Sequence, residues 1–390
     1  MPALEVALFE DDAWSDFAPL SSTRHVAQQL LGTAPIFEHV AKQTGTDDLQ
    51  LLGRKHLKEV VQLRTKLKYN DAKGPLLLIN ARVNPLTGLK RWVSLASGSA
   101  VMDRGDVVVA AIRSPDLEKV VTADGTLSRA RLGALAKGFE RIESSAPLLF
   151  GYPWDLLEAN GEAISAAAKG APKKLALSTD AEVEKFVSFD VRGGPVIVEG
   201  GARIEAFSRI SGPCYIGRGA TVLSALVRGG TTLGEGSKVG GEVANSIIYR
   251  RSNKAHFGYL GHSIVGEWVN IGAGAVTSDL KNTYGSVKVM RGREKVDTGL
   301  VKLGTMVGDM AKISIGSMIY GGRTLGVAAW CAGVVDTDVP DFTNYKGGDT
   351  APTRLKLEPL LRAQERMMAR RDEVLTAQER KAIERLYSSG

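Results

Sequence analysis

The feature that most constrains the fold is a period of six in the second half of the chain. From Pro195 onward an apolar residue recurs at many sixth positions, and glycine, glutamate or serine often follows it. An α-helix has a period near 3.6 and an ordinary strand a period of two, whereas a hexapeptide β-helix has a period of six. Each rung then forms one flat side of a triangular prism, and stacked coils bury a continuous core. The inward positions predicted are Val198, Ile204, Ile210, Ile216, Val222, Leu233, Val239, Val265, Ile271, Val307, Ile313, Ile319, Leu325 and Cys331.

Residues 244–256 and 277–303 interrupt this repeat. Loops expelled from a solenoid commonly build its binding face, so we expect ligand contacts there. A helical pattern with an apolar stripe follows from Arg354 to Tyr387, and we expect it to pack on the end of the coil as a cap.

The first half of the chain has a different pattern of apolar residues. Short apolar runs alternate with helical patterns, which favours an α/β domain. Residues 151–194, rich in alanine, glycine and lysine around 159–174, indicate a helical connector. The predicted organisation is an α/β domain at 1–150, the connector at 151–194, a parallel β-helix at 195–340 and a helical tail at 341–390. The predicted strands are 5–9, 76–80 and 106–112, and the predicted helices are 24–31, 34–42 and 56–67.

Charge, cysteine content and apolar runs restrict the kinds of partner and the compartment that we expect. The net charge of +7 suits an anionic ligand such as a phosphate, a nucleotide or coenzyme A. Nucleic acid is disfavoured because the basic residues form no long run with interleaved aromatics. Cys214 and Cys331 fit neither a metal cluster nor a disulfide framework, which favours a reducing cytoplasm. The sequence shows no signal pattern and no apolar run long enough to span a bilayer, so we expect no membrane partner.

The most specific motif is Lys-Ala-His-Phe-Gly-Tyr-Leu-Gly at 254–261, followed by Asn-Ile-Gly-Ala-Gly at 270–274. It resembles the acetyltransferase domain of the bifunctional N-acetylglucosamine-1-phosphate uridyltransferase / glucosamine-1-phosphate acetyltransferase family, over about residues 195 to 340. The resemblance implies a left-handed β-helix, acetyl-CoA as cosubstrate, and a homotrimer with its sites between subunits. It also implies that His256 is the base that deprotonates the attacking amine, a task suited to a near-neutral pKa.

Further roles follow from the same resemblance. It implies contacts with an amino sugar phosphate for Lys254, Tyr259 and Asn270, and contacts with acetyl-CoA for Ala273, Ser317 and Ala332. Two departures stand out. The family's asparagine after the second motif is Asp279 here, which would bind the substrate differently or prefer an amine. The family's lysine-rich coil before the histidine reads Asn-Ser-Ile-Ile-Tyr at 245–249.

Structural roles remain open for several of these residues. We expect His262 to be structural. Asparagines such as Asn270 also stack in ladders inside β-helices. The small residues at 272–274 suit a corner of the coil as well as a ligand that approaches the backbone.

The N-terminal region lacks the glycine-rich loop with which sugar-1-phosphate nucleotidylyltransferases cradle nucleotide phosphates. Its segment 9–24 instead resembles a divergent group of sugar nucleotidyltransferase-like proteins fused to the same solenoid. In the glycine-loop enzymes an aspartate at the end of the central strand holds Mg²⁺, and Asn80 stands there in this chain. Asp11 and Asp12 are the candidate Mg²⁺ ligands, or an acidic cap. Arg24 is the candidate phosphate ligand, or a structural arginine.

Two function hypotheses follow. In the first, the β-helix acetylates an amino sugar phosphate or nucleotide-linked amino sugar, and the N-terminal domain transfers a nucleotidyl group from a nucleoside triphosphate to sugar-1-phosphate with Mg²⁺. In the second, the chain is a non-catalytic sugar-nucleotide sensor or scaffold trimerised by the β-helix. A third, a zinc-dependent carbonic anhydrase, needs three histidines on neighbouring coils. Only His256 and His262 lie in the predicted solenoid.

Overall fold

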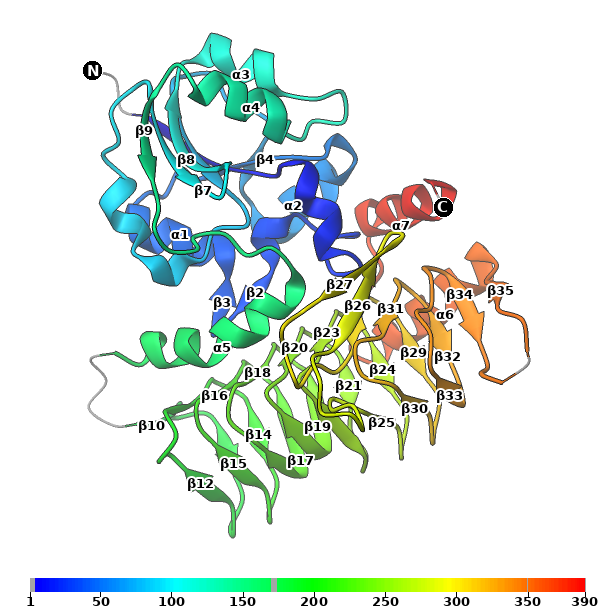
Figure 1. The fold of residues 1–390 in the computed structure, drawn as a ribbon. Coiled ribbons are helices and arrows are strands. Elements are labelled where there is room, and N and C mark those ends of the chain that lie inside the picture. Colours follow the sequence, from blue (N-terminus) through cyan, green and yellow to red (C-terminus); the bar gives the residue numbers. More distant parts are fainter. Residues whose placement is uncertain (1–3, 170–173, 349, 390) are drawn as a thin grey trace.

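The N-terminal domain is built on a seven-stranded, mostly parallel sheet (Figure 1). The computed structural model describes residues 4–169, 174–348 and 350–389. The three strands predicted from sequence are confirmed at their expected bounds. In spatial order the strands are β5 (Lys68–Tyr69), β4 (Gln50–Leu52), β1 (Glu5–Phe9), β6 (Leu76–Asn80), β8 (Asp106–Ile112), β7 (Ser99–Asp103) and β9 (Glu140–Glu143).

Helices cover both faces of this sheet, which explains why its central strands are apolar throughout. Successive side chains of a strand point to opposite faces: Val6 and Leu8 enter one core, and Ala7 and Phe9 enter the other. The helices are α1 (Ile36–Thr44), α2 (Lys58–Thr65), α3 (Ser114–Val120), α4 (Arg129–Ala136) and α5 (Pro153–Ala167).

The predicted helix at 24–31 is wrong. A short 3₁₀ turn occupies Val26–Gln28, and β2 (Leu30–Leu31) pairs with β3 (Ala34–Pro35). The side chain of His25 caps the turn. The buried residues that suggested a helix instead pack in the apolar cluster between the N-terminal domain and the β-helix.

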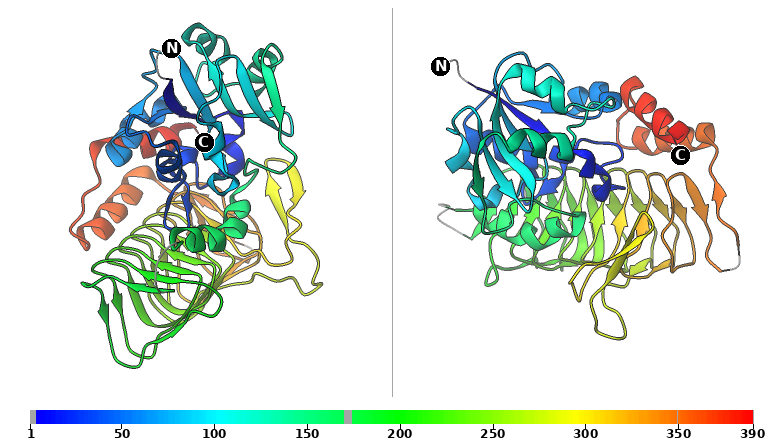
Figure 2. Two further views of the ribbon diagram at one scale, coloured as in Figure 1. Left: turned by 90° about the vertical axis from the view of Figure 1, so that its left-hand side faces the viewer. Right: turned by 45° about the horizontal axis from the view of Figure 1, so that its top comes forward.

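The second half of the chain winds into a left-handed parallel β-helix with three faces (Figures 1 and 2). The first face is an eight-stranded sheet: β10 (Leu175–Leu177), β13 (Val196–Val198), β16 (Cys214–Ile216), β18 (Thr231–Leu233), β20 (Ile247–Ile248), β23 (Ile264–Val265), β28 (Met306–Val307) and β31 (Thr324–Leu325). The second face contains β11 (Glu182–Val183), β14 (Arg203–Ile204), β17 (Thr221–Val227), β19 (Lys238–Ala244), β21 (Asn253–Lys254), β24 (Asn270–Ile271), β29 (Lys312–Ile313), β32 (Trp330–Cys331), β34 (Thr343–Tyr345) and β35 (Thr353–Arg354).

The third face contains β12 (Ser188–Asp190), β15 (Arg209–Ser211), β22 (Tyr259–Gly261), β25 (Val276–Thr277), β30 (Met318–Ile319) and β33 (Val334–Val335). The long strands β17 and β19 bend onto this face with their second halves, where they pair with β15 and β22. Every inward position predicted from the period of six is buried in the prism.

The β-helix begins earlier than the predicted boundary at 195, because strands β10 to β12 already form its first coil. The connector is therefore the helix α5, and part of its predicted flexible passage, 170–173, lies outside the described residues. The predicted interruption at 244–256 is also wrong, since β20 and β21 continue the coils there. The interruption at 277–303 is confirmed, and it carries the hairpin of β26 (Lys288–Arg291) and β27 (Glu294–Asp297).

The C-terminal tail forms two helices, α6 (Leu357–Ala369) and α7 (Ala377–Ser389). They do not cap the end of the coil. Leu360, Leu361 and Met368 of α6 pack with Trp268 and other side chains of the corner between the first and second faces. Helix α7 reaches α2 of the N-terminal domain (Figure 2). The apolar stripe predicted the helices correctly but could not indicate which surface they cover.

The N-terminal domain is seated on the first face of the β-helix. The side-chain amide of Asn160, in α5, accepts from Gly32 N at 2.7 Å and donates to Gly230 O at 2.9 Å. The Tyr249 hydroxyl, on the β-helix, accepts from Leu30 N at 2.8 Å. The described residues contain no helix long and apolar enough to cross a membrane.

Candidate active site

His256 lies at the corner between the second and third faces of the β-helix, after β21 and before β22. Its side chain is exposed, and its ring makes no hydrogen bond with any residue that the structure describes. The next residue, Phe257, is 72% exposed. The imidazole of His256 therefore faces solvent without an internal partner among the described residues.

Lys254 points into the prism, so the contact with substrate phosphate that the resemblance implied is wrong. It pairs in register with Val239, an inward position, and its side chain is buried. Its ammonium donates to Gly240 O at 2.7 Å and to His256 O at 2.9 Å. Burial lowers the pKa of Lys254 to about 8. Lys254 thus fixes the backbone of the corner that carries His256.

Ala273 occupies the same corner one coil further along. Gly274 N donates to Phe257 O at 2.9 Å, and Gly316 N of the following coil donates to Ala273 O at 2.8 Å. The structure therefore places Ala273 next to the corner of His256, and its contact with acetyl-CoA stays a prediction. Ala332 lies at this corner in a later coil, where its N–H donates to Tyr345 O at 2.8 Å.

Ser317 does not offer its side chain to a ligand. It is fully buried, and its hydroxyl donates to Ser314 O at 2.8 Å, which stabilises the turn. Asn270 lies on the second face, where its side chain accepts from Asn253 at 3.0 Å. This two-residue ladder is the structural alternative considered for Asn270, and it does not bring Asn270 to Tyr259 on the third face.

Tyr259 and Asp279 do meet, and His262 joins them. The Tyr259 hydroxyl donates to Asp279 Oδ2 at 2.7 Å, and His262 Nδ1 lies 2.6 Å from the same oxygen. Burial alone would raise the pKa of Asp279, but the hydrogen bonds from His262 and Tyr259 lower it below its usual value. Burial and the hydrogen bond to Asp279 raise the pKa of Tyr259. The cluster therefore holds an ionised carboxylate between a phenol and an imidazole.

A basic cavity of about 480 Å³ adjoins this cluster, and Asp279 forms part of its wall. The inserted segment 277–303 supplies most of the lining, and Tyr320, Gly321 and Arg323 supply the rest. Its positive charges come from Lys281, Lys288, Lys295 and Arg323. Four cations and one carboxylate suit a ligand that carries both a phosphate and an amine.

Arg24 is not a phosphate ligand. Its guanidinium is buried and paired with Asp309 of the β-helix, and it lies 3.6 Å from Glu267 and 4.5 Å from the centre of the Tyr249 ring. Burial alone would lower the pKa of Arg24, but the Asp309 and Glu267 carboxylates raise it. Thr23 also donates to Asp309. Arg24 is thus an interdomain anchor, the structural alternative for this residue.

Asp11 forms an ion pair with Arg82 at the carboxyl edge of the N-terminal sheet. Arg82 reaches its Oδ2 at 2.6 Å, and the Asn80 amide donates to the same oxygen at 2.9 Å. Arg82 also pairs with Asp106 at 2.9 Å. Asp12 is exposed and 4.0 Å from Arg129. Because a guanidinium already occupies the Asp11 carboxylate, this donor set does not fit a Mg²⁺ ion. The described parts of the chain hold no cluster of three His, Cys, Asp or Glu suited to a metal.

Sequence reasoning missed five residues of the site. His262 was expected to be structural, and its partner Asp279 follows after a whole coil. Lys281, Lys288, Lys295 and Arg323 were not singled out. The first three of these lie in the segment 277–303, whose interruption of the repeat is a signal for a binding face. A search for basic residues within that segment would have found them.

Comparisons with known proteins agree with this architecture. The family model described as sugar nucleotidyl transferase matches residues 6–173. Over 170 residues the chain is 35% identical to the bifunctional protein GlmU of Jannaschia sp. (strain CCS1), covering 42% of this chain and 33% of that protein. Over 211 residues it is 34% identical to GlmU of Methanocaldococcus jannaschii, covering 53% and 49%.

A third relative is the bifunctional sugar-1-phosphate nucleotidylyltransferase/acetyltransferase of Sulfurisphaera tokodaii. The chain is 32% identical to it over 195 residues, which cover 48% of this chain and 46% of that protein. The matches span half or less of the length of these curated relatives. The sugar nucleotidyl transferase model thus matches the N-terminal half of a chain that continues into a left-handed parallel β-helix, and the chain is similar to GlmU proteins over part of their length.

Proposed function

We propose that the β-helix transfers an acetyl group from acetyl-CoA to the amine of an amino sugar phosphate or a nucleotide-linked amino sugar. The single observation that carries this proposal is the position of His256. Its imidazole is exposed and has no partner among the described residues, and it lies at the corner that also carries Ala273. The names of the relatives, which include a nucleotidylyltransferase/acetyltransferase, support the same reaction.

In the proposed reaction His256 accepts a proton from the attacking amine. The neutral nitrogen then bonds to the thioester carbonyl carbon, and the carbon–sulfur bond breaks as the coenzyme thiolate leaves. The nitrogen gives up its second proton and the thiolate takes up a proton, so the products are an N-acetylated sugar, free coenzyme A and a protonated His256 that returns its proton to solvent. Positioned general bases contribute about 10²- to 10⁴-fold to such proton transfers. Lys254 acts as a positioning residue, because it holds the carbonyl of His256.

The acceptor site in this proposal is the basic cavity beside Asp279. The four cationic side chains bind the phosphate of the acceptor, and the Asp279 carboxylate binds its amino group while that group is charged. Tyr259 and His262 keep this carboxylate ionised and fixed.

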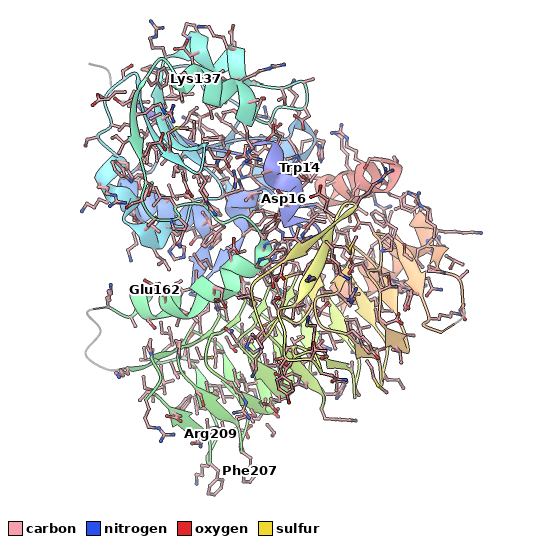
Figure 3. The ribbon with its side chains drawn as sticks, in the orientation of Figure 1. Trp14, Asp16, Lys137, Glu162, Phe207 and Arg209 are labelled. Atoms are coloured by element: carbon pink, nitrogen blue, oxygen red, sulfur yellow. The ribbon has the colours of Figure 1, made fainter. Side chains whose placement is uncertain are left out.

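The proposed assembly is a homotrimer in which the corner of His256 faces a second copy of the chain. Large apolar side chains lie exposed along this corner. Phe186 and Phe207 are 75% and 76% exposed and stack on each other with ring centres 5.7 Å apart, and Ile315 is 77% exposed. Figure 3 shows Phe207 projecting from the outer edge of the β-helix. A row of exposed apolar residues supports a protein interface, and a coenzyme site between copies would use it.

The test is release of free thiol from acetyl-CoA in the presence of glucosamine-1-phosphate, measured for the wild-type protein, His256→Ala and His56→Ala. His56 is a histidine of the N-terminal domain and serves as the matched control. We expect turnover for wild type and for His56→Ala, and at least about a hundredfold loss for His256→Ala. Equal turnover in all three proteins would show that His256 is not the base.

A second candidate function concerns the N-terminal domain. The Asp11–Arg82 ion pair stands where a nucleotidyl transfer site would need free carboxylates for Mg²⁺, which favours binding of a sugar nucleotide without nucleotidyl transfer. Calorimetric titration with a UDP-sugar, with and without Mg²⁺, tests the binding. Exchange of labelled pyrophosphate into nucleoside triphosphate tests the transfer. Exchange that depends on Mg²⁺ would establish the transferase activity instead.

A further inference from the structure

The inserted hairpin β26–β27 touches both halves of the molecule. Val287 and Lys288 at its base, and Lys295 nearer its turn, line the basic cavity of the β-helix. Val287 and Val289 are buried in the apolar cluster that continues into the N-terminal domain. Figures 1 and 2 show the hairpin leaving the side of the β-helix and reaching toward that domain.

The N-terminal domain holds the hairpin through Arg291, at the end of β26. Arg291 NH1 donates to Ala18 O at 2.8 Å, and its guanidinium lies 5.1 Å from the centre of the Trp154 ring of α5. That ring stacks on Tyr152 with centres 4.4 Å apart. Arg291 therefore contacts both the segment after β1 and the start of α5. Figure 3 labels Trp14 and Asp16 of this segment, next to the hairpin.

An isolated two-stranded hairpin is marginally stable in water. Within this one, the Lys288–Asp297 pair spans 3.9 Å between half-exposed side chains, and such pairs contribute little. The position of its two cavity lysines thus depends on what the hairpin packs against. The contacts of Arg291 are a charge-assisted hydrogen bond and a cation–π contact, both partly shielded from water, which are the stronger kinds of polar contact.

We propose that the N-terminal domain controls acceptor binding in the β-helix, with Arg291 as the positioning residue that holds Lys288 and Lys295 at the wall of the basic cavity. The expected change in the acceptor KM rests on the acetyl transfer proposed above. The positioning of the hairpin by Arg291 does not. It gives the N-terminal domain a role in the acetyl transfer whether or not that domain transfers nucleotides.

The experiment compares the full-length wild type with Arg291→Ala, Arg291→Lys and Arg293→Ala. Arg293 is an exposed arginine in the turn of the same hairpin and serves as the matched control. With glucosamine-1-phosphate as the acceptor, we expect Arg291→Ala to raise the acceptor KM about tenfold, the effect of losing one charged hydrogen bond. The KM for acetyl-CoA and kcat should stay within about twofold. Arg291→Lys keeps the charge but not the planar contact with Trp154. Its KM for the acceptor should therefore lie between those of the wild type and Arg291→Ala.

Hydrogen exchange of the amides at 287–298 gives a readout that does not need turnover. We expect about tenfold faster exchange there in Arg291→Ala and no change in Arg293→Ala. If exchange rises as expected but the wild type transfers no acetyl group, the proposed reaction fails and the positioning by Arg291 stands. Unchanged exchange, or equal effects on the KM values for acceptor and acetyl-CoA, would overturn the control by the N-terminal domain.

Discussion

His256 was predicted to be the catalytic base and Arg24 to be a phosphate ligand, but their surroundings in the structure are opposite. Arg24 is buried at the domain junction and pairs with Asp309 across it. His256 is exposed at a corner of the β-helix, and its imidazole has no partner within the described ranges. A residue type therefore suggests a chemistry, whereas burial and pairing decide whether its charged or basic atoms are available to a ligand.

Removal of Arg24 should have the largest effect on stability. Arg24→Ala leaves Asp309 buried without its cation, and breaking a buried pair in this way costs about 3–5 kcal/mol. We expect that loss in the free energy of unfolding, measured by denaturant titration. Arg129→Ala, which removes an exposed arginine that pairs with Asp106, should cost less than about 1 kcal/mol. A loss for Arg24→Ala no larger than for Arg129→Ala would refute the anchor.

We expect the buried Lys254, beneath the corner of His256, to make the free energy of unfolding depend on pH. Lys254 has a pKa lowered to about 8 in the folded chain, against about 10.4 when unfolded. Between these values the unfolded chain binds the extra proton, so stability rises with pH. The full shift corresponds to at most about 3 kcal/mol.

The measurement for this prediction is chemical unfolding of wild type and Lys254→Met from pH 7.5 to pH 10. The difference between the two proteins isolates Lys254, since other groups titrate in both. We expect the wild type to gain stability relative to Lys254→Met as the pH rises. A difference that is flat over this window would mean that the ammonium is not buried.

The smallest expected effect belongs to His256 itself. Because its side chain is exposed, His256→Ala should change the free energy of unfolding by less than about 0.5 kcal/mol. The same variant is expected to lose most of its acetyl transfer. Thermal and denaturant unfolding beside the thiol assay would check both halves of this expectation. A destabilised His256→Ala would indicate that the imidazole is structural, like Arg24.

The β-helix could be predicted from sequence because its rule is local. One apolar side chain in six points inward, so positions such as Val222 and Ile313 are fixed by spacing alone. The inward orientation of Lys254 was missed although the residue occupies such a position, because a shorter coil shifts the spacing there and a lysine is not expected inside a core. The start of the prism was missed because the period of six breaks between Phe189 and Val198, although Leu177, Val183 and Phe189 keep it within the first coil.

The contacts between domains could not be predicted. Arg24 and Asp309 are 285 positions apart, and nothing near either residue indicates the other. The same holds for Arg291, whose partner Ala18 offers only a backbone carbonyl. The Tyr259–Asp279–His262 cluster could be predicted only in part. The resemblance singled out Tyr259 and Asp279, but only the coil geometry brings His262 to the same oxygen.

We propose above that the corner of His256 is a catalytic site shared between copies of the chain, and native mass spectrometry of the full-length protein with coenzyme A tests this proposal. We expect a particle of three 41.6 kDa chains that takes up coenzyme A, and we expect this particle to dissociate when Phe207 is replaced by aspartate. A single chain that binds coenzyme A, or a trimer that neither Phe207→Asp nor Phe257→Asp dissociates, would refute the shared site.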